Sequence, residues 1–187
     1  MATGTEAKPM RADARRNYER LLSVAREAFT ENGADASLDD IARRAGVGPG
    51  TLYRHFPNRD ALLAAVVADW IEELRVEAGD LLTADDAFAA LEVWLRRLLR
   101  HLGTYRGLAS AIIAASGDPH SELAAACVPM HDNGAALVQR ALRGSSVTAK
   151  DVHRLVHAIV VATEPLPDRH AAADRMLAVV IAGLRTS

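Results

Sequence analysis

The chain has 187 residues and a net charge of −2, which excludes a polycation that binds nucleic acid over its whole surface. Half of its residues are apolar, only 4% are aromatic and runs of β-branched residues are rare, so the composition favours helices. Its one cysteine, Cys127, excludes a disulfide within the chain and suits a reducing compartment. Residues 1–16 lack the apolar core of a signal peptide, and no apolar run reaches the roughly 20 residues that cross a bilayer, so we expect a cytoplasmic protein.

Three helices are predicted in the first third of the chain. Residues 1–12 are small and polar and are expected to form a disordered arm. The first helix follows, with a stripe of apolar residues at spacings of three and four that begins at Tyr18 and ends at Phe29, and Gly33 is its expected C-cap. Ser37 is a suitable N-cap for the second helix, which Gly46 ends. Pro49 suits the first position of the third helix, because the N–H that it lacks would be unpaired there.

The rest of the chain is predicted to be helical as well. Asn58 is suited to cap a fourth helix, and Asp118, which precedes a proline, marks a later helix start. The segments "TADD" at 83–86 and "TAKD" at 148–151 resemble capping boxes with aspartate in place of the usual glutamate. Five further helices are expected at about 84–102, 104–116, 119–143, 148–163 and 168–185. The sequence therefore predicts an all-α fold of about nine helices.

The third helix, "PGTLYRHF" at residues 49–56, has two different faces. At about 100° per residue, Leu52 and Phe56 lie together and point inward, whereas Gly50 and Arg54 lie opposite and point outward. A threonine hydroxyl and a tyrosine phenol flank the outer face. That face therefore combines a guanidinium and two neutral hydroxyl groups around a residue without a side chain.

The segment from Arg43 to Arg59 is locally basic, because it holds four arginines and no acid. Arginines and hydroxyls bind DNA phosphates, and a helix N-terminus accommodates a phosphate oxygen. Two short helices joined through "AGVG" have the form of a helix-turn-helix, whose second helix enters the major groove. The alternative is an ordinary solvated basic surface, with Tyr53 at the edge of the core.

The segment "SLDDIARRAGVGPGTLYRHFPNRDALL" closely resembles the DNA-binding signature of the tetracycline-repressor-like (TetR/AcrR) transcription regulators, over roughly residues 15–65. The resemblance implies a three-helix helix-turn-helix DNA-binding domain at 13–60 and a larger helical effector-binding and dimerisation domain at 61–187. It also implies contacts with double-stranded operator DNA from Ser37, Arg44, Gly48, Pro49, Gly50, Thr51, Tyr53, Arg54, His55 and Arg59.

One of these positions departs from the family. Gly48 stands where Ser or Thr is common, which removes a hydroxyl contact with DNA. Arg54 is then the one side chain on the outer face that is suited to a bidentate contact with guanine. We therefore expect sequence specificity to depend partly on DNA shape and on the spacing of two half-sites.

The last two predicted helices are apolar around much of their circumference, and such helices must be buried on several sides. A partner subunit would cover them if two helices from each chain formed a four-helix bundle. The alternative is that both are central core helices. The residues expected at a homodimer interface are Val152, Leu155, Val156, Ile159, Val160, Met176, Val179, Val180 and Leu184.

Large apolar residues with a few polar tips are typical of ligand sites, although each one is individually a candidate for plain core. The expected lining of an effector pocket comprises Trp70, Leu74, Trp94, Leu98, His101, Tyr105, Ile112, Met130, His131 and Leu137. These stretches hold no cluster of Lys or Arg, so we expect a largely apolar small-molecule effector rather than a strongly anionic one.

Two pairs with the spacing of metal ligands also occur. His153 and His157 lie four residues apart on one predicted helix, but the intervening glutamate of a metalloprotease is missing and no third ligand is evident. Cys127 and His131 share that spacing, with Pro129 between them, and a buried thiol is the alternative. We therefore expect no metal and no cofactor.

Three classes of function are compatible with a helical chain of this size. The favoured one is a ligand-responsive transcriptional repressor that acts as a homodimer on a palindromic operator. An enzyme is disfavoured, because the sequence holds no phosphate loop, nucleophile motif or paired carboxylates. A structural DNA-binding protein without an effector is the remaining alternative, and it would bind DNA of any sequence with a steep dependence on salt.

Overall fold

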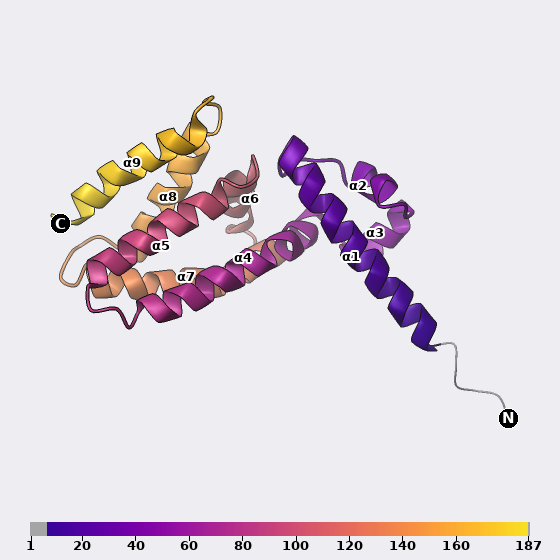
Figure 1. The fold of residues 1–187 in the computed structure, drawn as a ribbon, viewed down its shortest axis with the longest axis horizontal. Helices are drawn as coiled ribbons and strands as arrows, with labels where there is room; N and C mark the ends of the chain where they lie inside the picture. The colour runs from indigo at the N-terminus through magenta and orange to yellow at the C-terminus, as the bar shows by residue number, and fades with distance from the viewer. Residues whose placement is uncertain (1–6, 187) are drawn as a thin grey trace.

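The computed structural model describes residues 7–186, which form nine α-helices and no strand (Figure 1). The prediction of an all-α fold of about nine helices is therefore confirmed. None of these helices combines the length and the apolar character that spanning a membrane requires. Their bounds are α1 Ala7–Asn32, α2 Leu38–Arg44, α3 Pro49–His55, α4 Arg59–Leu81, α5 Ala87–Leu102, α6 Leu108–Ala115, α7 Glu122–Ala141, α8 Ala149–Thr163 and α9 Arg169–Leu184.

The first helix begins earlier than the sequence predicts. Residues 1–6 of the expected arm lie outside the described residues, whereas residues 7–12 form the first turns of α1 rather than a disordered segment. Pro9 is compatible with this start, because a proline in the first turn of a helix removes no internal hydrogen bond.

Several helix ends are fixed by the caps that the sequence predicts. The side chains of Ser37 and Asn58 accept hydrogen bonds from the backbone of α2 and α4, and Thr148 and Asp151 form the expected capping box of α8. Two other caps were predicted wrongly. The carboxylate of Asp86 caps α5 in place of the "TADD" threonine, and Ser121 rather than Asp118 caps α7. Aspartate and serine are equally good caps, so spacing alone does not choose between neighbouring candidates.

The first three helices pack on one another and on the beginning of α4, at one end of the molecule (Figure 1). We call α1–α3 the head. Its interior is closed by buried apolar side chains from each helix: Leu21, Ala25 and Phe29 of α1, Ile41 and Ala42 of α2, and Leu52 of α3. Gly46 has φ +67° between α2 and α3, a left-handed conformation that glycine adopts without a steric penalty.

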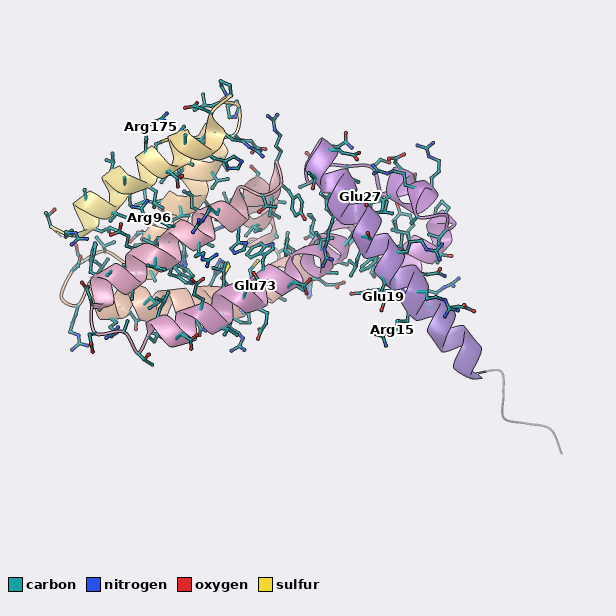
Figure 2. All side chains as sticks on the ribbon, viewed as in Figure 1. Arg15, Glu19, Glu27, Glu73, Arg96 and Arg175 are labelled. Atoms are coloured by element: carbon teal, nitrogen blue, oxygen red, sulfur yellow. The ribbon has the colours of Figure 1, made fainter. Side chains whose placement is uncertain are left out.

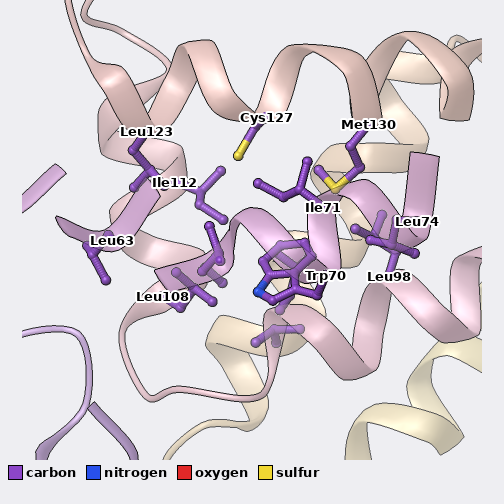
Figure 3. Close-up of a cluster of buried hydrophobic side chains, with 14 of the residues drawn as sticks. Leu63, Trp70, Ile71, Leu74, Leu98, Leu108, Ile112, Leu123, Cys127 and Met130 are labelled. Carbon is purple, nitrogen blue, oxygen red and sulfur yellow. The ribbon is translucent and has the colours of Figure 1, made fainter. Parts of the chain in front are cut away.

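The other five helices gather along the remainder of α4 and form the body of the molecule. In it α4 and α5 pack against α7, and α8 packs against α5, α6, α7 and α9. Figure 3 shows how Trp70 of α4, Ile112 of α6 and Cys127 and Met130 of α7 converge in this core. All of the side chains that line it are almost entirely excluded from solvent.

Head and body also meet through hydrogen bonds that join three distant parts of the chain. The backbone N–H of Ala34, after α1, donates to the carbonyl of Arg106 at 2.6 Å. The next residue, Gly107, donates its backbone N–H to the carboxylate of Glu164 at 2.5 Å. Glu164 is the C-cap residue of α8. We call these four residues the joint, because they connect the head to the last helices of the body.

Candidate nucleic-acid interface

The outer face of α3 is an accessible part of the head. Leu52 and Phe56 point into the core as predicted, whereas Gly48, Pro49, Gly50 and Arg54 are exposed or partly exposed. Tyr53 is 44% exposed, although tyrosine carries a large apolar ring. The remaining predicted contacts of this helix, Thr51 and His55, are half-buried at its flanks. A partly apolar and partly cationic surface therefore surrounds the start of a helix whose N-cap residue offers no side-chain hydrogen bond.

The arginines of the head differ sharply in their partners. Arg54 has neither an ion pair nor a hydrogen bond to any residue in the described part of the chain. By contrast, Arg43 pairs with Asp40, its neighbour one turn back on α2. On α1, Arg15 pairs with Glu19 at 2.8 Å, near the outer end of the helix (Figure 2). Arg54 is therefore the guanidinium of the α3 face that is available to a phosphate or a base.

Arg44 and Arg59 have internal partners instead. Arg44 pairs with Glu31 at 2.7 Å and with Glu27 at 3.4 Å, and both acids lie on α1. The hydrogen bond from Arg44 to Glu31 raises the pKa of Arg44, so its charge is retained. Arg59 donates to the carbonyls of Ala34 and Ala36 at 2.6 and 2.7 Å. Both arginines hold the helices of the head together, and their part in DNA binding stays a prediction.

Two other predicted DNA contacts, Ser37 and His55, interact with neighbouring groups of the head. A third residue at this surface, Tyr18, was not predicted as a contact. Ser37 is exposed and receives the Asp40 backbone N–H at 3.3 Å. His55 lies edge-on to the ring of Tyr18 of α1, with centroids 5.9 Å apart, and Tyr18 also stacks on Phe56 at 5.1 Å. The sequence placed Tyr18 in the buried stripe of α1, yet 37% of it is exposed beside α3. The sequence offered one indication of this exposure, because Tyr18 is the first residue of that stripe.

Comparisons with known proteins agree with this geometry. Residues 21–66 match the family model of bacterial regulatory proteins of the tetR family, and residues 86–186 match the C-terminal domain of SbtR-like transcriptional regulators. The crystal structure of the TetR transcriptional regulator SCO0520 from Streptomyces coelicolor is 32% identical and covers 89% of this chain and 97% of its own, with a TM-score of 0.58. A TetR transcription regulatory protein from Mycobacterium vanbaalenii is also 32% identical, over 95% of this chain and 99% of its own, with a TM-score of 0.53.

The chain belongs to the TetR family. It is a DNA-binding transcriptional regulator. Curated relatives match a shorter stretch: the regulator UidR of Escherichia coli K12 is 42% identical over 64 residues, which are 34% of this chain and 29% of UidR. The chain thus covers less than a third of the length of that relative.

The body of this TetR-family regulator holds the predicted pocket residues mainly as core. Seven of the ten are buried among α4, α5, α6 and α7, namely Trp70, Leu74, Trp94, Leu98, Ile112, Met130 and Leu137. His101 is half-buried and stacks on Trp70 with ring centroids 5.1 Å apart, and Tyr105 lies edge-on to Phe29 at 6.0 Å. Of the ten, His131 alone lines the groove between α6, α7 and α8 that the next paragraph describes. The structure therefore does not gather the ten residues around a single cavity.

An open groove of about 900 Å³ lies between α6, α7 and α8. We call it the α6–α8 groove. Its walls are apolar in part, and His131, His153 and His157 lie along it. No group of three or more His, Cys, Asp or Glu side chains within residues 13–186 is arranged to hold a metal ion. The groove is lined by Ile113, Ser116, Gly117, His131, Asp132, Ala135, Ala149, Lys150, His153, Arg154, His157, Ala158, Val161 and Ala162.

The predicted dimer residues divide into two groups. Five are buried within the single chain, namely Val152, Val156, Ile159, Val160 and Leu184, as expected for core helices. Leu155 of α8 and Met176 of α9 are each 43% exposed, and Val179 of α9 is 74% exposed. Val180 is half-buried. These four leave a smaller apolar surface on α8 and α9 than the sequence predicts.

Proposed function

We propose that this regulator is an effector-responsive repressor that binds a palindromic operator as a homodimer. The observation that carries the proposal is the outer face of α3, where Arg54 has no partner in the described chain and Tyr53 and Gly50 are exposed. An Arg on the recognition helix forms bidentate hydrogen bonds with guanine in the major groove. The hydroxyls of Thr51 and Tyr53 would bind phosphates on either side and fix the register.

A homodimer is supported by the apolar side chains that α8 and α9 leave exposed. Val179, Met176 and Leu155 would be covered if α8 and α9 of two copies packed together. Two heads would then read two half-sites about one helical turn of DNA apart. A palindromic operator follows from the two-fold symmetry of such a dimer.

A response to an effector is supported by the joint. Its hydrogen bonds run from the loop after α1 to Arg106 and Gly107, and from there to Glu164 at the end of α8. A ligand that moves α6 or α8 would therefore shift the head and change the spacing of the two half-site contacts. Coupling of this kind lowers the affinity for DNA when the ligand prefers the shifted state.

Solved structures of similar fold show which small molecules such proteins have been crystallised with. The regulator FadR of Bacillus subtilis was crystallised with stearoyl-CoA, and RolR with resorcinol. These structures are 18% and 20% identical to this chain, with TM-scores of 0.56 and 0.54, so the likeness is one of fold. Because operator DNA is cytoplasmic in bacteria, we place the regulator there as part of the same proposal.

The deciding experiment is selection of bound fragments from sheared genomic DNA at physiological salt, followed by sequencing. We expect enrichment of one palindromic site. The Arg54→Ala variant should bind that site about 5- to 100-fold more weakly and lose preference at one base pair in each half-site. Arg75→Ala is the matched control, because Arg75 is exposed on α4 and pairs with Glu72 away from the head.

The alternative of a structural DNA-binding protein predicts a flat fragment profile and a steep loss of affinity with salt. Equal binding of palindromic and scrambled duplexes by the wild type would therefore refute the proposal. Sedimentation of the free protein tests the homodimer separately, with Val179→Asp as the variant expected to dissociate it.

A further inference from the structure

The three histidines of the α6–α8 groove form a connected aromatic series. The rings of His131 and His153 stack with centroids 5.0 Å apart and 29° between their planes. The ring of His157 lies edge-on to His131 at 6.3 Å, and on the other side Trp94 contacts His153 at 5.5 Å. Two helices therefore present a layered set of aromatic surfaces to the groove, onto which a further aromatic ring can stack.

The nitrogen atoms of these rings are unusually placed. The Nε2 atoms of His131, His153 and His157 are all covered from solvent and have no hydrogen-bond partner in the described chain. His157 as a whole is only 6% exposed. Buried polar atoms in native proteins are nearly always hydrogen-bonded, so three orphaned nitrogens beside one groove indicate a partner that is supplied from elsewhere.

The proton on His157 can be assigned from its neighbour. Nδ1 of His157 lies 2.8 Å from the backbone carbonyl of His153, which can only accept a hydrogen bond. Nδ1 therefore carries the proton and donates it, and Nε2 of the neutral ring is left with a free lone pair. Burial lowers the pKa of all three imidazoles, and that of His153 falls to about 3 with a further contribution from the other two rings. At neutral pH the three imidazoles are thus uncharged, and Nε2 of His157 is a hydrogen-bond acceptor beside the groove.

The other groups of the groove restrict the ligand further. Its charged side chains are Asp132 from α7 and Lys150 and Arg154 from α8, while α6 contributes Ile113 and two small residues follow it. The net positive rim disfavours a cationic ligand. An anion could pair with Lys150 or Arg154, but a carboxylate or phosphate only accepts hydrogen bonds and would leave the lone pair on Nε2 of His157 without a donor. A neutral molecule with a hydroxyl donor meets neither obstacle.

We propose that the α6–α8 groove binds a neutral aromatic compound that carries a hydroxyl group, and that Nε2 of His157 accepts a hydrogen bond from this phenolic hydroxyl. The ring of the ligand stacks beside His131, and the apolar wall of Ile113, Ala158 and Val161 covers the remainder. This names the chemical class of the effector, and so it rests on the proposed function.

The test compares 4-ethylphenol with 4-ethylanisole, which has nearly the same shape but no donor, by calorimetric titration of the full-length wild-type protein. A hydrogen bond to an otherwise unpartnered acceptor should make the phenol bind about tenfold tighter or more. The preference should persist from pH 8 to pH 7, because the lowered pKa values keep the imidazoles neutral there. The heat of binding should be equal in buffers of different ionisation enthalpy, since no proton is taken up.

Variants locate the site. His157→Phe keeps an aromatic ring but removes the acceptor, and it should reduce the affinity for 4-ethylphenol to that for 4-ethylanisole. His101→Phe is the control, because His101 stacks on Trp70 outside the groove. If circular dichroism shows that His157→Phe does not fold, the comparison of the two probes on the wild type decides alone.

Equal affinities for the two probes, or no binding of either at millimolar concentration, would overturn the inference. So would tighter binding of 4-ethylbenzoate with uptake of a proton, since it would identify an anion site. Operator binding is measured on the same preparation. Operator binding without a preference for the phenol refutes this inference alone, whereas phenol binding by a protein that selects no operator refutes the proposed function alone.

Discussion

Gly134 lies in the middle of α7, where its lack of a side chain allows α5 to approach. A Cβ atom at Gly134 would lie 2.1 and 2.6 Å from the indole carbons of Trp94 and 2.8 Å from Nε2 of His153. Trp94 is fully buried, so its ring has no free space into which it can turn. The Gly134→Ala variant therefore forces a rearrangement in the core, and such overpacking costs about 3 kcal/mol at the upper end of its usual range.

Alanine also favours the helix over glycine by about 1 kcal/mol, so the net loss in the free energy of unfolding should be about 2 kcal/mol. Urea denaturation followed by circular dichroism at a fixed protein concentration measures it. Gly79→Ala is the control, because Gly79 lies inside α4 and a Cβ atom there would have no neighbour within 4 Å. This control variant should gain about 0.5–1 kcal/mol.

A double variant tests the cause of this loss. Trp94→Phe removes the six-membered ring that the new methyl group meets, so the two substitutions together should cost less than the sum of their separate effects. A Gly134→Ala protein that is as stable as the wild type, or two effects that simply add, would refute the steric explanation.

The remaining predictions concern a thiol, a cap and acid stability. Burial raises the pKa of Cys127 to about 11, so iodoacetamide at pH 7.5 should modify it slowly in the folded protein and rapidly in urea, as mass spectrometry would show; equal rates would contradict its burial. Asn58→Ala removes the acceptor that receives the Ala61 N–H at 2.8 Å and should lower the free energy of unfolding by about 1 kcal/mol, whereas Asn58→Ser should preserve most of it. The folded-state pKa of His153 lies below its unfolded value of about 6.5, so the unfolded chain binds the extra proton and stability is lost as the pH falls from about 6.5. Urea denaturation at pH 7.5 and pH 5 should show a smaller acid loss for His153→Gln than for the wild type, and an equal loss would contradict this account.

The local features of the fold could be predicted from sequence because their causes are local. Caps such as Asn58 and the inward faces of helices such as Leu52 and Phe56 depend on residues within one or two turns. The partners of Arg44 and Arg59 could not be predicted in this way. These arginines bind groups on α1 and on the loop after it, 13 or more residues away in the chain.

The candidate effector site was the least predictable part, for a physical reason. Periodicity indicates which side chains point into a bundle, but it does not indicate whether the space between them is filled. Trp94 and Met130 were candidates for a pocket and are packed core. His153 and His157 were considered as a metal pair, and the neighbour that changes their interpretation, His131, comes from another helix.

The chemical groups of the joint determine which residues must accompany the head when it is transferred to another protein. Three of its four groups are main-chain atoms, and Gly33 and Gly107 both have φ +77°. The exposed side chain of Arg106 is therefore replaceable in principle, while the length of the turn before α6 is not. A chimera that grafts this head onto another sensor would need to carry that turn and the acid at position 164 with it. Without them, the chimera would keep the DNA-binding surface of the head but would lose the contacts through which, on the proposed function, the body changes the affinity for DNA.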